Sequence, residues 1–366
     1  MKELSGRHRQ RSLSTLLWIG IWGIVTVPAI SADPQPPIAK EQTVAQASGG
    51  GSQTTPFAPI APPPASTDEI TVQSIGFDER TTALLHDSKG NLWVGSWQGL
   101  ARIDPKTGRT LVKAVLPNTT VGALAEDRVG RIWVGSTEGL MRVDPRTGRV
   151  TTMNFALPSN RVLSLLVDRR GFLWVGTDAG LAMISPDRGL LMTTLKNLPG
   201  VSANALTLDS DGHLWVGTLE GLVQVNTANA FPRRRIADLP GVEVQALAWS
   251  HWKTLWVGTP AGVLELDPNS KKPIRVLPRM QGKDVTVLDF DKVSSLWVGT
   301  SEGLWRVNPY NGMVGGQIPR LPSGRILALS TDAANKLWVG TSQGLAWISM
   351  QSFRSGTHNT FPQPTR

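Results

Sequence analysis

Short apolar runs separated by turn residues recur along most of the chain. In one copy, Val162–Val167, Phe172–Gly176 and Leu181–Ile184 are apolar, and the turns between them are Asp168–Gly171 and Thr177–Gly180. Aspartate first and glycine last are typical of a type I turn. A fourth short run ends the preceding copy. Runs of this length are too short for helices, so the pattern predicts four strands joined by tight turns.

A central tryptophan marks every copy of this pattern. The tryptophans follow one another at intervals of 40 or 41 residues: Trp93, Trp133, Trp174, Trp215, Trp256, Trp297 and Trp338. Self-similarity with this period indicates either a helical solenoid or a propeller, and four-stranded sheets repeated around an axis form a propeller. The sequence therefore predicts an all-β fold, a seven-bladed β-propeller of four-stranded blades.

The two ends of the repeat array predict how the ring closes. The last copy provides three strands, and residues 351–366 hold few apolar residues and are expected to form a C-terminal tail. Just before the first copy, Glu69–Phe77 alternates apolar and polar residues, as a strand does. We expect this N-terminal strand to be added to the last blade as its outer strand, so that the propeller spans residues 69–350.

The first 32 residues have a different composition. Basic residues precede the apolar run 13–30, and Ala29-Ile30-Ser31 offers a cleavage site, as in a secretory signal peptide. The run is also just long enough to span a bilayer, so an uncleaved membrane anchor is the alternative. Either interpretation predicts an exported protein, periplasmic or secreted, with a possible membrane tether through residues 13–30.

Residues 33–68 are rich in proline, alanine, serine and glycine. Such a segment cannot bury enough apolar surface to offset the loss of chain entropy on folding. It is expected to be a disordered linker between the N-terminal segment and the propeller.

Composition narrows the chemistry. The chain has 14 tryptophans, one tyrosine and no cysteine, which excludes disulfides and thiolate metal sites. The formal net charge of +9 favours anionic partners, which include nucleic acid, anionic lipid and acidic envelope polymers. Because an exported protein seldom meets nucleic acid, no nucleic-acid partner is expected. The cluster Arg233–Arg235 is expected in a loop between blades, solvated or in contact with anionic envelope material.

The repeat resembles the two-component regulator propeller repeat. The resemblance is carried by the segment from Leu157 through Gly180 and by the Asp-Pro-x-Thr-Gly sequences at Asp104–Gly108 and Asp144–Gly148. In that family such repeats form the periplasmic sensing region of hybrid histidine kinases and also occur in standalone exported proteins. Some 19 residues follow Trp347, so no kinase is expected in this chain. A weaker resemblance to the streptogramin-lyase type of propeller lacks that family's histidine and metal motifs.

Residues fixed in every copy are expected to serve the scaffold. One tryptophan at the same position in each blade predicts packing between sheets rather than a stacking platform for a ligand. Aspartates six residues before the tryptophans are expected to accept hydrogen bonds from their own turns rather than to bind calcium: Asp87, Asp127, Asp168, Asp209, Asp291 and Asp332. No metal site and no cofactor are predicted.

Positions that vary between copies are the candidates for function. The thirteenth residue before each central tryptophan is expected to ring one mouth of the channel: Arg80, Thr120, Arg161, Ser202, Glu243, Asp284 and Arg325. The turns after Trp-Val-Gly should add residues on the same face: Trp97, Glu138, Asp178, Glu220, Glu302 and Gln343. A mouth with arginines on one side and acids nearly opposite would suit a zwitterionic or peptide-like ligand. The alternative is a solvated rim.

Three functions are compatible with this pattern. The first is a non-enzymatic binding or scaffold propeller, expected to be a monomer, that uses one face for a ligand or an envelope protein. The second is a standalone sensor subunit that acts with a separate membrane kinase. The third is a lyase or hydrolase, which the sequence supports weakly because His86, His213, His251 and His358 occupy different repeat positions.

Overall fold

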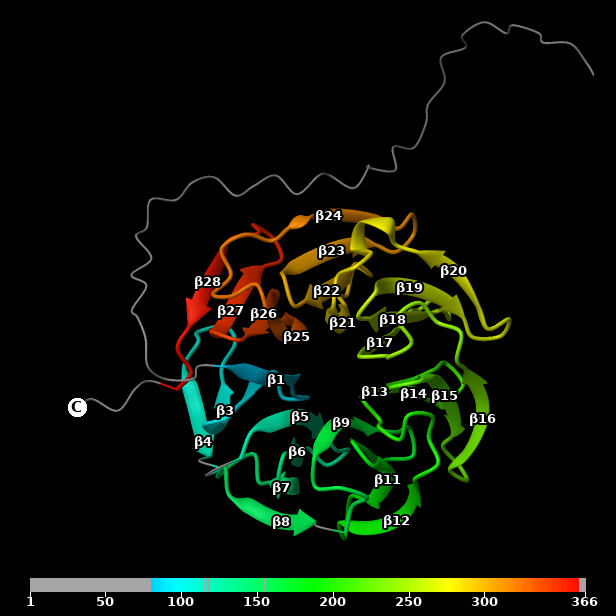
Figure 1. Cartoon of the computed structure of the whole chain (residues 1–366). Coiled ribbons are helices and arrows are strands. Elements are labelled where there is room, and N and C mark those ends of the chain that lie inside the picture. The colour runs from blue at the N-terminus through cyan, green and yellow to red at the C-terminus, as the bar shows by residue number, and fades with distance from the viewer. Residues whose placement is uncertain (1–79, 115, 117–118, 155, 362–366) are drawn as a thin grey trace, which may run out of the picture. The chain divides into compact units, whose positions relative to one another are not determined.

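The computed structural model describes residues 80–114, 116, 119–154 and 156–361. Within these residues, 28 strands form seven antiparallel sheets of four, each made of strands consecutive in sequence. Figure 1 shows the seven sheets arranged as blades around a common axis. The predicted seven-bladed propeller of four-stranded blades is confirmed. The N-terminal segment 1–32, the linker 33–68 and Glu69–Phe77 lie outside the described residues.

Two strands of each blade lie closest to the axis. The innermost strands are β1 (Thr81–His86), β5 (Val121–Glu126), β9 (Val162–Val167), β13 (Ala205–Leu208), β17 (Ala246–Trp249), β21 (Val285–Phe290) and β25 (Ile326–Ala333). The second strands are β2 (Leu92–Ser96), β6 (Ile132–Ser136), β10 (Leu173–Thr177), β14 (Leu214–Thr218), β18 (Leu255–Thr259), β22 (Leu296–Thr300) and β26 (Lys336–Thr341).

The other two strands of each blade lie toward the rim. The third strands are β3 (Gly99–Ile103), β7 (Gly139–Val143), β11 (Gly180–Ser185), β15 (Gly221–Asn226), β19 (Gly262–Asp267), β23 (Leu304–Asn308) and β27 (Gly344–Ser349). The outer strands are β4 (Thr110–Ala114), β8 (Val150–Asn154), β12 (Leu190–Leu195), β16 (Phe231–Ile236), β20 (Lys272–Val276), β24 (Met313–Gln317) and β28 (Ser355–His358). A short 3-10 helix, η1 (Pro278–Met280), precedes β21.

The core lies between neighbouring blades. Along Leu173-Trp174-Val175, successive side chains point to opposite faces of the sheet. Trp174 packs against Leu214 and Val216 of the next blade, whereas Leu173 and Val175 pack against Trp133 of the blade before. All seven central tryptophans are at most 1% exposed. The expectation that they pack between sheets is confirmed.

The glycine two residues after each tryptophan permits this close packing. A Cβ placed on Gly176 would lie 2.2 Å from Ser164 Oγ and 2.3 Å from Ala203 O, the latter on the next blade. The second repeated glycine has another role, since Gly180 has a φ of +132° at the start of β11. Glycine adopts that conformation without a steric penalty.

Most of the repeated aspartates fasten the turn to the tryptophan. Asp168 Oδ1 accepts hydrogen bonds from the amides of Arg170 (2.9 Å) and Phe172 (3.0 Å), and Oδ2 accepts one from Trp174 Nε1 (3.1 Å). The same bond from the tryptophan is made by Asp87, Asp127, Asp209 and Asp291. The turn role predicted for these aspartates is confirmed.

Asp332 departs from this pattern. It has a φ of +62° in a longer inner strand and accepts a hydrogen bond from the amide of Lys292 (2.7 Å). Within the part of the chain that the structure describes, Trp338 Nε1 has no hydrogen-bond partner. The turn role predicted for Asp332 is therefore wrong.

Ring closure differs from the prediction. In the last blade, β28 pairs with β27, with Leu345 opposite His358 and Ile348 opposite Ser355, so residues expected to form a tail provide the outer strand. The prediction that an N-terminal strand fills this place is wrong. An outer strand is held mainly by backbone hydrogen bonds, so its low apolar content was a poor criterion for excluding it.

Contacts between side chains and backbone close the ring from the last blade to the first. Lys336 Nζ donates to Pro105 O (3.0 Å), and His358 Nε2 donates to Gly108 O (2.6 Å). Trp338 packs with Leu92 of the first blade. The seam is thus closed by packing and hydrogen bonds between two complete blades.

Among the described residues, no helix has the length and apolar character needed to cross a bilayer. The predicted tether, residues 13–30, lies outside this part of the chain.

Candidate functional site

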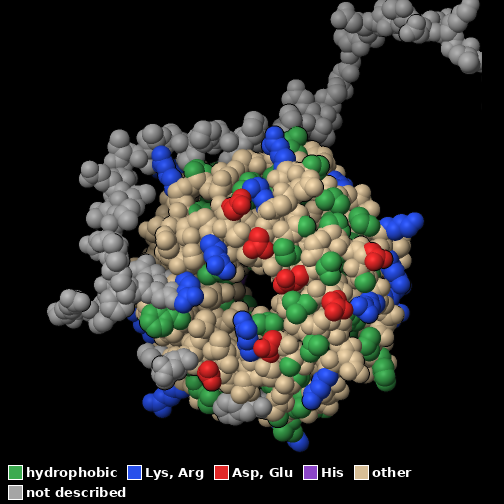
Figure 2. Space-filling model, in the orientation of Figure 1, with side chains coloured by type: hydrophobic (Ala, Val, Ile, Leu, Met, Phe, Trp, Pro, Cys, Tyr) green, Lys and Arg blue, Asp and Glu red, His purple; other side chains and the backbone are tan. Residues whose placement is uncertain are grey.

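One face of the ring is formed by the ends at which the inner strands begin. Because adjacent strands are antiparallel, the turns between second and third strands lie on the same face. Backbone bonds join the two sets of residues: the amide of Asp178 donates to Arg161 O (3.4 Å), and that of Ser342 donates to Arg325 O (3.0 Å). Figure 2 shows a central opening with basic and acidic side chains around it.

The residues that precede the inner strands are here called the channel mouth. They are Arg80, Thr120, Arg161, Ser202, Glu243, Asp284 and Arg325. Five of them directly precede an inner strand, and Ser202 and Glu243 come three residues before one. The three arginines are exposed, whereas Glu243 and Asp284 are half-buried. Among the channel-mouth residues, the positive charges thus lie on blades 7, 1 and 3, and the negative charges lie on blades 5 and 6.

On blades 4, 5 and 6, three buried polar atoms near the mouth have no hydrogen-bond partner among the described residues. They are Ser202 Oγ, Gln245 Oε1 and Asp284 Oδ1. Buried polar atoms in folded proteins are nearly always hydrogen-bonded, so unsatisfied ones at a channel indicate a place for water or a ligand. Two of the three are pure acceptors, and they suit a ligand that donates hydrogen bonds.

The second set of predicted site residues divides into two groups. Trp97, Glu138 and Asp178 are exposed beside the mouth. By contrast, Glu220 pairs with Arg235 of the outer strand β16 (3.3 Å), and Glu302 pairs with Lys283 (2.8 Å). The last two carboxylates therefore contact neighbouring side chains of the same face. A ligand-binding role for the predicted set stays a prediction.

The arginine cluster lies on a strand. Arg233, Arg234 and Arg235 belong to β16, so the loop expected there is wrong. They line a shallow groove with Asn197–Pro199, and Arg234 reaches the next blade by donating to Pro268 O (2.8 Å). A run of arginines is compatible with an outer strand because the long side chains extend into solvent from the rim.

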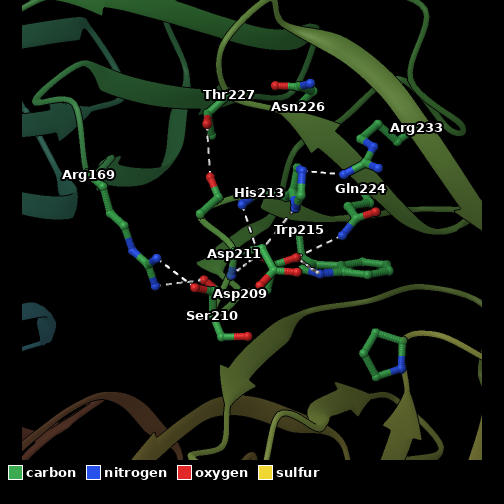
Figure 3. Close-up of polar contacts among 12 residues, drawn as sticks. Arg169, Asp209, Ser210, Asp211, His213, Trp215, Gln224, Asn226, Thr227 and Arg233 are labelled. Carbon is green, nitrogen blue, oxygen red and sulfur yellow. Dashed lines mark hydrogen bonds and ion pairs between the residues drawn. The ribbon is translucent and has the colours of Figure 1, made fainter.

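A second cluster of titratable groups lies at the turn between β13 and β14 of blade 4 (Figure 3). Because adjacent strands are antiparallel, this turn is on the face opposite the channel mouth. Oxygen and nitrogen atoms of Asp209, Asp211 and His213 lie within 4.8 Å of one another, a spacing that a metal ion could bridge. The Asp209 carboxylate already accepts hydrogen bonds from four donors. The guanidinium of Arg233 also contacts His213 Nε2. A cation would have to displace these groups, so the cluster is organised as part of the turn.

Three of the four described histidines lie away from the mouth. His86 ends an inner strand, and His213 and His251 lie in turns between first and second strands. These positions belong to the face opposite the channel mouth. A catalytic histidine at the mouth is therefore not provided by these three residues.

Asp289 is a half-buried carboxyl that the repeat pattern did not single out. Its place on the inner strand is taken in the other blades by Leu85, Ala125, Leu166, Thr207, Ala248 and Ser330. The amide of Thr331 in the next blade donates to Asp289 Oδ2 (3.2 Å). Burial raises the pKa of Asp289 to about 6, and the nearby Asp332 carboxylate acts in the same direction. Aligning the seven copies by their tryptophans would have revealed this exception.

Because the unfolded chain ionises this carboxyl near pH 3.8, the folded protein binds the proton more tightly between pH 4 and 6. We expect the parent protein to gain about 1–2 kcal/mol from this group as the pH falls from 7 to 4. Asp289→Asn should thus be more stable than the parent at pH 7 and nearly equal to it at pH 4, as measured by urea unfolding.

Asp104→Asn is the control for this prediction. The hydrogen bond from the Lys106 amide lowers the pKa of the Asp104 carboxyl. Ionised Asp104 therefore stabilises the fold, and this contribution decreases as the pH falls, opposite to the effect of Asp289. A constant difference between Asp289→Asn and the parent across pH 4–7 would contradict the assignment.

The fold and the channel mouth define a seven-bladed β-propeller with a charged channel entrance. The model of the two-component regulator propeller family matches residues 75–98, 115–138, 156–179 and 197–220. Four segments of the chain therefore match the two-component regulator propeller repeat, in agreement with the resemblance noted in the sequence. None of the curated proteins compared with the chain matches it in sequence.

Solved structures share the fold at low identity. The extracellular domain of BT4673 from B. thetaiotaomicron, a proposed one-component system, is 20% identical with a TM-score of 0.63, over 74% of this chain and 38% of that one. That of BT3049 from the same organism, a proposed hybrid two-component system, is 19% identical with a TM-score of 0.62, over 75% and 41%. Virginiamycin B lyase from Staphylococcus aureus is 14% identical with a TM-score of 0.63, over 74% and 94%.

At these identities the likeness shows the fold alone. The chain spans about two fifths of the length of the two extracellular domains.

Proposed function

We propose that this protein is an exported binding propeller that takes a zwitterionic, peptide-like ligand at the channel mouth. The opposed charges of the mouth, with arginines on blades 7, 1 and 3 and acids on blades 5 and 6, are the observation that carries the proposal. On the acidic side, the described residues provide no donor for the buried Asp284 Oδ1. A carboxylate oxygen that is buried without a donor is unfavourable, and a ligand ammonium group would satisfy it with a charge-assisted hydrogen bond.

The opposite side of the mouth complements the other end of such a ligand. Arg161 and Arg325 are exposed and directly precede their inner strands, which fixes the backbone from which they extend. A guanidinium binds a carboxylate through two parallel hydrogen bonds. Amino and carboxylate groups at the two ends of a short peptide would thus meet charges of opposite sign.

Export is supported by the basic and apolar N-terminal sequence and by the extracellular origin of the two B. thetaiotaomicron domains. The same two domains favour a second candidate function, a standalone sensor subunit that passes ligand binding to a separate kinase. Co-purification with a membrane histidine kinase is the result that this second function requires.

Titration of the full chain with a library of tripeptides tests the binding proposal. The library contains each peptide with free termini, with an acetylated N-terminus and with an amidated C-terminus. We expect binding by members with free termini, and at least a tenfold increase in Kd in Arg161→Ala, Arg325→Ala and Asp284→Asn, since a charged hydrogen bond contributes about 1.5–3 kcal/mol.

Lys89→Ala, an exposed charge on the opposite face, is the matched control and should leave Kd unchanged. The absence of any binding by free-terminus peptides would refute the proposed ligand class. Binding that survives all three mouth substitutions would refute the proposed site.

A further inference from the structure

The seven outer strands offer an internal comparison of how exposed sheet edges are protected. An outer strand has one unpaired edge, and proteins protect such edges with charged residues, proline or short length. Proline occurs in β16 and β20, lysine in β4, and β28 has only four residues. Three outer strands, β8, β12 and β24, have none of these features, and β12 is the longest and most apolar of the three, with the sequence Leu-Leu-Met-Thr-Thr-Leu.

The first three residues of β12 are all exposed. Leu190, Leu191 and Met192 have exposed fractions of 53%, 37% and 52%. The register with β11 shifts between Met183 and Ile184, which places an extra residue in β12. A strand with strict alternation would bury every second side chain, whereas this irregularity leaves three consecutive apolar side chains in solvent.

The neighbouring blade extends this apolar surface. On β8, Val150 and Met153 are 38% and 50% exposed. The two strands lie close together, because a Cβ on Gly189 would be 3.3 Å from Thr152 Cγ2. We call the five exposed side chains on β8 and β12 the apolar edge. Figure 2 shows apolar side chains beside a basic one at the lower rim, where Figure 1 places these strands.

Basic side chains flank the apolar edge. Arg146, Arg149 and Arg188 are exposed in the two turns that lead into β8 and β12, and no ion pair among the described residues includes them. The two carboxylates of the same turns already have partners. Asp187 pairs with Arg131 (3.1 Å), and Asp144 accepts a hydrogen bond from the amide of Arg146 (2.8 Å).

We propose that the apolar edge of blades 2 and 3 docks this protein onto an anionic lipid bilayer. Exposed apolar side chains insert at the boundary of the headgroups and acyl chains, and adjacent arginines are attracted by anionic headgroups. Each basic residue near such a surface contributes about 1 kcal/mol, and this contribution is screened by salt.

The charge distribution favours a bilayer over a second copy of the chain. Pairing two apolar edges would bring together two sets of turns in which arginines outnumber aspartates, and net charges of the same sign facing each other oppose association. An anionic membrane has the complementary charge and can accept several side chains without specific pockets.

A site-specific fluorescent label tests this proposal in the full chain. Because the protein lacks cysteine, Leu191→Cys introduces a single attachment point for the environment-sensitive dye NBD. Vesicles of phosphatidylglycerol mixed with phosphatidylcholine should raise the NBD emission severalfold and shift it to shorter wavelength. Lipid carrying a nitroxide on its acyl chain should quench that emission. Vesicles of phosphatidylcholine alone should have little effect.

Ile274→Cys is the matched control, since Ile274 is 48% exposed on β20, an outer strand with proline and charged residues. Its label should stay in water with both kinds of vesicle. This comparison separates docking of the apolar edge from any binding by the N-terminal segment, which would hold both labelled proteins equally. Thermal unfolding of each labelled protein verifies that the propeller is folded.

Arg146→Gln, Arg149→Gln and Arg188→Gln, combined in the Leu191→Cys protein, should abolish most of the emission increase. Equal emission from the labels at positions 191 and 274, or equal increases with charged and neutral vesicles, would overturn the proposal. An increase that depends on protein concentration without vesicles would overturn it in favour of a second copy.

Discussion

Trp174→Ala is expected to lower the free energy of unfolding by about 3–5 kcal/mol, the range for truncating a large aromatic side chain in a core. Trp174 is fully buried against the next blade, and its indole nitrogen donates to Asp168. The substitution removes the packing surface between two blades and leaves the Asp168 carboxylate short of a donor. Urea unfolding followed by circular dichroism measures the change.

Trp97→Ala is the control for this substitution. Trp97 is 37% exposed in the turn before β3, so its removal should change stability by less than about 1 kcal/mol. Similar unfolding midpoints for the two variants would show that the repeated tryptophan does not carry the packing between blades.

Truncation after Met350 is expected to lower the free energy of unfolding by about 2–4 kcal/mol, because it removes β28 and the seam contacts that follow it. The deleted segment includes His358, which bonds to Gly108 O in the first blade, and the buried Thr360. The thermal midpoint and the width of the transition measure how far closure of the ring supports the other blades.

Truncation after Phe361 is the control, because it retains every described residue. A protein that ends at Met350 but melts like the full chain would show that β28 does not stabilise the ring. His358→Ala removes only one contact of the seam, so it should lower the free energy of unfolding by less than the truncation does.

The prediction of the outer edge of each blade was less successful than that of its centre. Arg233–Arg235 of β16 were expected in a loop between blades, and the segment that contains β28 was expected to be a tail because it has few apolar residues. Both segments form outer strands, whose stability depends on backbone pairing with the third strand more than on apolar side chains. Composition therefore says little about strands at a rim.

The candidate site could be located but not evaluated from sequence. The repeat period placed the residues that precede the inner strands, since each is thirteen residues before a tryptophan. Whether a carboxylate on this face is paired depends on which side chain another strand brings beside it: Glu220 pairs with Arg235 of β16, whereas the described residues provide no hydrogen-bond partner for Asp284 Oδ1. Asp289 likewise acquires its raised pKa from burial and from a neighbouring blade.

By itself, the sequence determined the number of blades, the four-stranded repeat, the buried tryptophans and most of the aspartate-capped turns. These features depend on interactions within one copy of the repeat or on a contact made identically by every pair of copies, so periodicity is sufficient to predict them. Only the tertiary structure decided how the ring closes, which charges at the mouth are paired, and that apolar residues on β8 and β12 form one exposed edge. Each of these depends on residues that differ from copy to copy and on which of them the fold brings together, within a blade or between blades, so periodicity alone does not reveal it.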